Sequence, residues 1–156
     1  MPALSFKRRF GKAVENGLAV VHGQPLPWPD VEPKLYTVRK RRRVPIEIGD
    51  RLVLYEQQRS PHRRHLGETQ CLYARELIIN SVDLASSVTT DPDGREVRLR
   101  QRVISVIGSP YDVDALARLL GFANLQEMVD FYKGEHGLPF VGVLHSWDPS
   151  RPWEEK

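Results

Sequence analysis

The chain of 156 residues contains a single cysteine, Cys71. One thiol cannot form an internal disulfide, and no second thiol is present to build a cysteine-rich zinc site. The histidines are scattered and lack acidic or thiol neighbours at the spacing of metal ligands: His22, His62, His65, His136 and His145. We therefore expect no metal and no cofactor, and we interpret Cys71 as a small buried side chain.

Long apolar runs are also missing. None approaches the roughly 20 residues that a membrane-spanning helix needs. The first residues, Met1–Lys7, lack the hydrophobic centre of a signal peptide. There is no glycine-rich phosphate loop and no Gly-x-Ser-x-Gly nucleophile motif. These absences lead us to expect one soluble, cytoplasmic domain with no membrane partner, and 156 residues suffice for a single core.

The charge of the chain is unevenly distributed. Residues 1–65 hold 14 Lys and Arg against 6 Asp and Glu, a net charge of +8. Residues 66–156 hold 9 against 14, a net charge of −5. This polarity favours a phosphate-bearing partner for the first half, although a basic face is often only solvated surface.

The first half begins with a helical pattern. Phe6, Phe10 and Val14 recur at four-residue spacing, which predicts a helix from about Lys7 to Asn16 that stops at Gly17. Four prolines exclude a helix between residues 18 and 33 and favour an extended path that carries Trp28.

Strand patterns occupy the middle of the chain. Residues 35–39 and 51–56 alternate as two strands that we expect to be close partners, followed by a basic loop over 57–67. Residues 70–84 predict a strand through the centre of a sheet. A turn at Asp91–Gly94 precedes a strand over 96–107, whose alternation slips near Gln101 and indicates a bulge.

Helix signals return in the last third. Ser109 and Pro110 resemble the start of a helix that ends at Gly121. Asn124, with Glu127 three residues later, predicts the cap of a second helix ending at Gly134. A last strand over 140–147 precedes a tail at 148–156. The pattern predicts an α+β domain, a curled sheet or a small barrel.

The stretch at 34–39 carries the clearest candidate chemistry. A threonine hydroxyl such as that of Thr37 is a poor nucleophile unless a base takes its proton. Lys34 can be that base if burial or nearby cations such as Arg39 lower its pKa. Thr37 and Arg39 share one face of a strand, so Lys34 must precede the strand to join them. The same pattern also fits an ordinary exposed polar face.

Two basic tracts bracket the predicted strand pair, and their arginines suit phosphate. Their candidate nucleic-acid-binding residues, together with Arg39, are Lys40, Arg41, Arg42 and Arg43, and Arg59, Arg63 and Arg64. If the two strands adjoin, the tracts lie on one rim. Tyr36, Tyr55 or Trp28 could stack on a base there.

The order of these features resembles the ASCH family of the PUA-like superfamily, in particular the small stand-alone members of bacteriophages and prophages. Residues 34–39 resemble the signature Gly-x-Lys-x-x-Thr-x-Arg, with Glu32 at the position of the glycine. Further blocks follow in the family's order: Met1–Phe6 with Phe10, Gly49–Tyr55, Arg59, Leu66–Glu68 with Cys71, Gly121–Ala123, and His136–Phe140 with Trp147.

The resemblance implies one domain over residues 1–147, a PUA-like small mixed β-barrel with flanking helices. Residues 18–33 would be a proline-rich insertion and 148–156 a C-terminal tail. The protein would work in a prokaryotic cell or a phage-infected host. The family also implies a cleft beside the signature for RNA or a nucleotide-like ligand.

Some members of the family are amidohydrolases that deacylate N4-acetylcytidine with a lysine, a threonine and a glutamate. Lys34 and Thr37 match the first two, whereas the position of the acid falls on Leu120 or Gly121. We nominate Glu56 as a replacement acid. Its alternative role is that of an ion-pair partner for an arginine.

Three hypotheses follow from these residues. The first is a module that binds RNA or a modified nucleotide or nucleoside in a basic cleft beside the signature. The second is a metal-independent amidohydrolase of N4-acetylcytidine-type nucleosides, with Thr37 as nucleophile and Lys34 as base. The third is a phage protein that binds and inhibits a host factor through residues 18–33.

Overall fold

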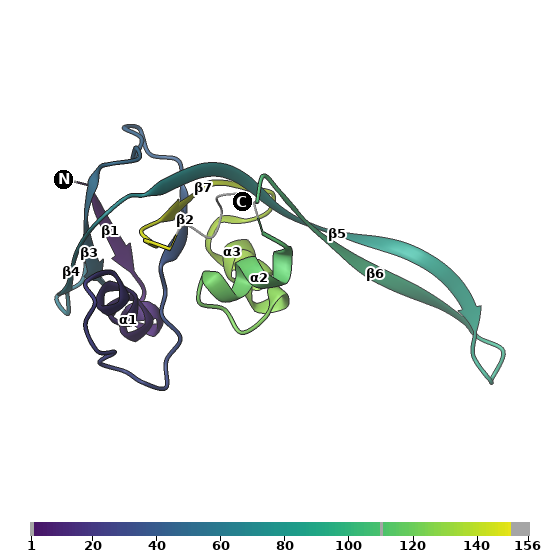
Figure 1. Ribbon diagram of the computed structural model, residues 1–156. Coiled ribbons are helices and arrows are strands. Elements are labelled where there is room, and N and C mark those ends of the chain that lie inside the picture. The colour runs from purple at the N-terminus through teal and green to yellow at the C-terminus, as the bar shows by residue number, and fades with distance from the viewer. Residues whose placement is uncertain (1, 110, 151–156) are drawn as a thin grey trace.

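The computed structural model describes residues 2–109 and 111–150, except for the side chains of 82–89 and 97–102. Figure 1 shows the arrangement of the elements, which confirms the predicted α+β class. The elements are β1 (Ala3–Phe6), a 3-10 helix η1 (Arg8–Phe10), α1 (Gly11–Val21), β2 (Tyr36–Lys40), β3 (Arg51–Glu56), β4 (Arg64–Gln70), β5 (Tyr73–Thr90), β6 (Glu96–Ile107), α2 (Val113–Leu119), α3 (Leu125–His136) and β7 (Phe140–Ser146).

The strands form two sheets. One has the order β1-β3-β4, with β1 parallel to β3 and β3 antiparallel to β4. The other has the order β2-β7-β5-β6 and is antiparallel throughout. β5 is an inner strand, as predicted for residues 70–84. No closed barrel is found among the described strands. No helix in the described residues is long and apolar enough to cross a membrane.

The expected pairing of the strands at 35–39 and 51–56 is wrong. β2 pairs with β7, which places Thr37 opposite His145, and β3 pairs with β1 and β4. Residues 41–50 carry the chain from one sheet to the other. The last strand of the chain takes the place beside β2, and proximity in sequence does not reveal this pairing.

The first helix continues to Val21, beyond its predicted stop at Gly17. Gly17 is instead the point where the backbone before β2 crosses α1, because a Cβ atom there would lie 2.1 Å from the carbonyl oxygen of Lys34. The Lys34 N–H also donates to the Ala13 carbonyl oxygen (2.8 Å). These contacts fix the start of the candidate signature against α1.

The proline-rich segment begins after Val21 and is fastened to the same helix. Asn16 is fully buried. Its amide donates to the carbonyl oxygens of Trp28 (2.7 Å) and Val31 (2.6 Å) and accepts from the Trp28 N–H (3.0 Å). The Trp28 ring lies 4.6 Å from the Lys12 ammonium and is partly exposed. The segment is therefore an anchored loop on α1.

β5 and β6 continue beyond the second sheet as a two-stranded arm that projects from the body (Figure 1). The predicted turn closes the arm, with the Gly94 N–H donating to the Asp91 carbonyl oxygen (3.0 Å). The irregularity expected near Gln101 lies on the opposite strand, between Ala85 and Ser87. The helical ribbons α2 and α3 lie against one face of the second sheet, where Tyr132 of α3 stacks on Phe140 of β7 with ring centroids 4.9 Å apart.

The ends of the last two helices agree only partly with the prediction. Asn124 caps α3 through the Glu127 N–H (2.9 Å), as predicted, but the helix continues to His136. Asp112 rather than Ser109 caps α2 by accepting from the Ala115 N–H. The predicted first helical residue, Pro110, and residues 151–156 of the predicted tail lie outside the described residues.

The close approach at Gly17 predicts opposite effects for two glycine substitutions. Gly17→Ala should lower the free energy of unfolding by about 1–3 kcal/mol, because the new methyl group overlaps the Lys34 carbonyl. Gly134→Ala is the matched control: Gly134 is helical and exposed, with no atom near its virtual Cβ, so this change should stabilise by about 0.5–1 kcal/mol. Urea denaturation measures the change in the free energy of unfolding for each variant. If the two changes had the same sign, the assigned role of Gly17 would be contradicted.

Candidate functional site

Lys34 lies two residues before β2 with only 4% of its surface exposed. Its ammonium group donates to the carbonyl oxygen of Leu120, just beyond α2, and lies 5.0 Å from the centroid of the Phe10 ring. Burial, followed by the charges of Arg39 and Arg9, lowers the pKa of Lys34 well below its usual value of 10.5. This ammonium is therefore easier to deprotonate than that of a surface lysine.

Thr37 and Arg39 lie on one face of β2, as predicted. The Arg39 Nε donates to the Thr37 hydroxyl oxygen (3.0 Å), and the guanidinium lies 4.5 Å from the centroid of the Phe6 ring. Thr37 is buried, whereas Arg39 is partly exposed. Burial lowers the pKa of Arg39 to about 10, so the guanidinium remains charged at neutral pH.

These two cations lack a counter-ion in the part of the chain that the structure describes. Within residues 2–109 and 111–150, no Asp or Glu forms an ion pair with Lys34 or Arg39. The Glu127 carboxylate on α3 is held by Arg9, which lowers the pKa of Glu127. A charge withdrawn from water without a counter-ion is costly, and an anion bound here would offset that cost.

His145 lies between this cluster and the basic tract at 40–43. It lies opposite Thr37 on β7, is 3% exposed, and has its Nδ1 3.9 Å from the sulfur of the fully buried Cys71. Burial, then the charges of Arg39 and Arg42, lowers the pKa of His145 to about 4. His145 also lines a small hollow of about 170 Å³, together with residues that include Lys40, Arg41 and Arg42.

Glu56, the nominated replacement acid, takes part in a different contact. Its carboxylate accepts from the Arg64 Nε (3.1 Å), and Arg64 also pairs with Glu15 (2.7 Å). A Cβ atom on Gly11 would lie 2.0 Å from Glu56 Oε1, so this carboxylate packs against the start of α1. In the described part of the chain, neither Lys34 nor Thr37 is a hydrogen-bond partner of Glu56.

The two basic tracts do not share one rim, because β2 and β3 do not adjoin. Arg42 and Arg43 line an open hollow of about 780 Å³ together with Arg51, at the start of β3. Arg64 pairs with Glu56, at the end of β3. The length of β3 therefore separates the tracts by about 17 Å.

Their charges are also differently engaged. Arg64 is occupied by two carboxylates, Arg63 lies 5.8 Å from the Tyr55 ring, and Arg59 is exposed. In the other tract, Lys40, Arg42 and Arg43 are exposed without an ion pair to any described residue, and Arg41 reaches Glu76 only at 3.8 Å. The tract at 40–43 is therefore the stronger candidate for binding an anion.

Leu120 and Gly121, where the resemblance to the ASCH family leads us to expect an acid, face Lys34. The Leu120 carbonyl oxygen accepts from the ammonium, and a Cβ atom on Gly121 would lie 3.5 Å from Lys34 Cδ. Gly121 has φ +92°, a conformation that favours glycine. At this position the chain therefore offers a backbone carbonyl, not a carboxylate, to the lysine.

Two residues around the site, Arg9 and Arg51, were not singled out by the sequence, and Leu120 was named there only as a position lacking an acid. Their contacts depend on segments far apart in the chain, such as residues 34 and 120. His145 was recognised only as one of several scattered histidines. Its position opposite Thr37 follows from the pairing of β2 with β7, for which no local pattern exists.

No group of three or more His, Cys, Asp or Glu side chains within the described residues could hold a metal ion. Comparisons with protein-family models, with curated proteins and with solved structures find no significant match to this chain.

The low pKa of His145 predicts acid sensitivity. The imidazole titrates at about 4 in the folded protein and near 6.5 when unfolded, so its contribution to stability is complete above pH 6.5 and is lost towards pH 4. At pH 5 the loss should be about 2 kcal/mol. His145→Gln should remove this part of the pH dependence, whereas the control His22→Gln, at an exposed histidine, should retain it. The test is the free energy of unfolding, measured by urea denaturation from pH 4 to 8. If this free energy depended on pH identically in His145→Gln and in the wild type, the assignment of the acid sensitivity to His145 would be contradicted.

Proposed function

We propose that this chain binds RNA or a phosphate-bearing modified nucleotide through Lys34, Thr37 and Arg39 and the adjoining basic tract, Lys40–Arg43. The carrying observation is that two desolvated cations, Lys34 and Arg39, have no carboxylate partner among the described residues. A phosphate group would supply the missing charge and accept hydrogen bonds from both side chains.

The surroundings favour a polyanion over a single small anion. Arg39 is partly exposed, and the strand continues from it into the exposed Lys40 and three arginines. A ligand with successive phosphates could therefore reach from the buried site to the surface. RNA and its building blocks carry such groups, and the charge of +8 on residues 1–65 supports the same class of partner.

We extend the proposal to the protein family and to the fold superfamily. The chain is an ASCH-type, PUA-like domain. Lys34, Thr37 and Arg39 gather at the start of β2 as the signature requires. Leu120 and Gly121, at the position of the family's acid, lie against Lys34.

The second candidate is an amidohydrolase of N4-acetylcytidine-type nucleosides, favoured by the lowered pKa of Lys34. Neutral Lys34 would take the proton of the Thr37 hydroxyl as its oxygen attacks the amide carbon. The cytidine amine would leave with that proton, and water would hydrolyse the acyl-threonine. The hydrogen bonds from Lys34 to Leu120 and from Arg39 to Thr37 would both have to loosen, which makes binding the better supported function.

The binding proposal predicts that Arg39→Met weakens RNA affinity at least tenfold, because loss of a desolvated charge–phosphate contact costs about 1.5–3 kcal/mol. The measurement is fluorescence anisotropy with a labelled single-stranded RNA over a series of salt concentrations. Arg118→Ala, which removes an exposed charge from α2, is the control and should bind as the wild type does. An affinity that does not vary with salt would contradict the proposal.

The amidohydrolase candidate predicts that the protein releases cytidine and acetate from N4-acetylcytidine. Mass spectrometry measures this release. Thr37→Val keeps the shape of the side chain and removes the nucleophile, and Lys34→Met removes the base, so each should abolish turnover. Absence of turnover by the wild-type protein at high concentration would reject this candidate and leave the binding proposal intact.

A further inference from the structure

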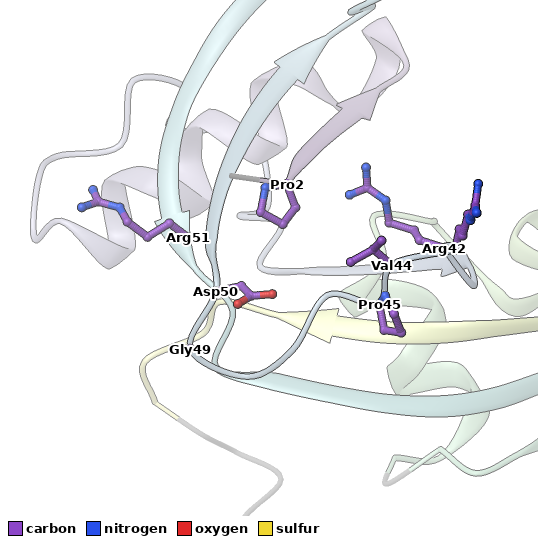
Figure 2. Close-up of a pocket in the computed structure, with 8 residues that line it drawn as sticks. Pro2, Arg42, Val44, Pro45, Gly49, Asp50 and Arg51 are labelled. Atoms are coloured by element: carbon purple, nitrogen blue, oxygen red, sulfur yellow. The ribbon is translucent and has the colours of Figure 1, made fainter.

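The hollow at the start of β3 has a defined composition. Figure 2 shows Pro2, Val44 and Pro45 near its centre, with Arg51 on one side and Arg42 on the other. Arg43, Gly49 and Asp50 complete the lining. Its volume of about 780 Å³ lies within the range of roughly 300–1,000 Å³ that is usual for small-molecule sites.

Backbone hydrogen bonds hold one side of this hollow in place. The Gly49 N–H donates to the Cys71 carbonyl oxygen (2.7 Å), and the Cys71 N–H donates to that of Asp50 (2.8 Å). The Asp50 carboxylate accepts from the Glu47 N–H (2.9 Å) and so closes its own turn. This side of the hollow is therefore formed before a ligand arrives.

The arginines around the hollow are available to a ligand. Arg43 has no hydrogen bond or ion pair with the described residues. Arg51 meets Glu68 only at 3.5 Å, with 68% of its side chain exposed, and Arg42 reaches the Ala3 carbonyl oxygen at 3.4 Å. The lining thus contains three arginines and one carboxylate, Asp50, together with the apolar residues Pro2, Val44 and Pro45.

We propose that this hollow is a subsite for an unpaired segment of RNA, which deepens the proposed function and rests on it. One base packs on Pro2, Val44 and Pro45. The phosphates before and after it contact Arg51 on one side and Arg42 with Arg43 on the other. The separation of the arginines by an apolar floor matches the alternation of base and phosphate along a single strand.

The apolar floor selects the single strand over the duplex. In an RNA duplex the faces of the bases are stacked on one another, and proteins contact mainly phosphates and 2′-hydroxyls. A base must leave the stack before its face can lie on proline rings and a valine. Charge alone would bind either form, whereas the floor requires an unpaired base.

The hollow adjoins the small hollow beside His145. Arg42 and Pro45 line both the large hollow and the small one beside His145. His145 lies opposite Thr37 on the sheet. A strand seated in the large hollow would therefore continue past Arg42 towards Arg39.

The test compares a labelled unstructured RNA of about 12 nucleotides with the same RNA annealed to its complement. The wild type should bind the single strand at least tenfold more tightly than the duplex. Arg43→Ala/Arg51→Ala should weaken single-strand binding at least tenfold. It should also reduce the slope of log affinity against log salt by about 1.4, since each phosphate contact to a single strand contributes about 0.7. Val44→Glu, at a side chain 79% exposed, should weaken binding without unfolding the protein.

The control variant is Arg95→Ala, which removes one exposed charge next to the turn of the β5–β6 arm. Figure 1 shows the end of this arm far from β3. This variant should bind both RNAs as the wild type does. Equal affinity for duplex and single strand would overturn the subsite. The subsite would also be overturned if Arg43→Ala/Arg51→Ala bound RNA as tightly as the wild type while Arg39→Met had lost affinity. In that case the proposed binding of RNA would remain without the subsite. If the wild type binds neither RNA, the proposed function fails and the subsite fails with it.

Discussion

The desolvation of two cations beside β2 is the constraint on which the rest of this structure depends. Lys34 is held between α1, the ring of Phe10 and the carbonyl of Leu120, and Arg39 lies over Phe6. No described carboxylate neutralises either charge. The fold tolerates this cost because the cations are placed by many unrelated contacts. A site that lowers its own stability in this way is typical of function, because a ligand can supply what the fold leaves out.

The distribution of carboxylates divides the arginines into two groups. Arg64 pairs with Glu56 and Glu15 and ties the end of β3 to α1, and Arg9 pairs with Glu127 and ties η1 to α3. In contrast, the arginines at 42 and 43 have no such partners within the described residues and surround an apolar hollow. The sequence shows the positive charge of the first half of the chain, and the structure shows which of these arginines have carboxylate partners.

Local signals in the sequence predicted the features that depend on local physics. The Asn124 cap, the turn at Asp91–Gly94 and the strand at 51–56 were found from a few neighbouring residues. Gly17 was misread as a helix stop, because its role is a close approach by a segment that is distant in sequence. The partner of β2 was missed for the same reason. The predicted shared face of Thr37 and Arg39 is confirmed by their hydrogen bond, whereas the Leu120 carbonyl that binds Lys34 is a backbone group that no side-chain pattern reveals.

The central claim is that Lys34 and Arg39 bind an anionic group of a ligand. The pKa of Lys34 reports directly on such binding. Its ammonium can be titrated by NMR in the free protein and in the presence of saturating single-stranded RNA. The account predicts a pKa well below 10.5 in the free protein and a clear rise when RNA is bound, because a nearby phosphate stabilises the charged form. A pKa of Lys34 that is unchanged by bound RNA would contradict it.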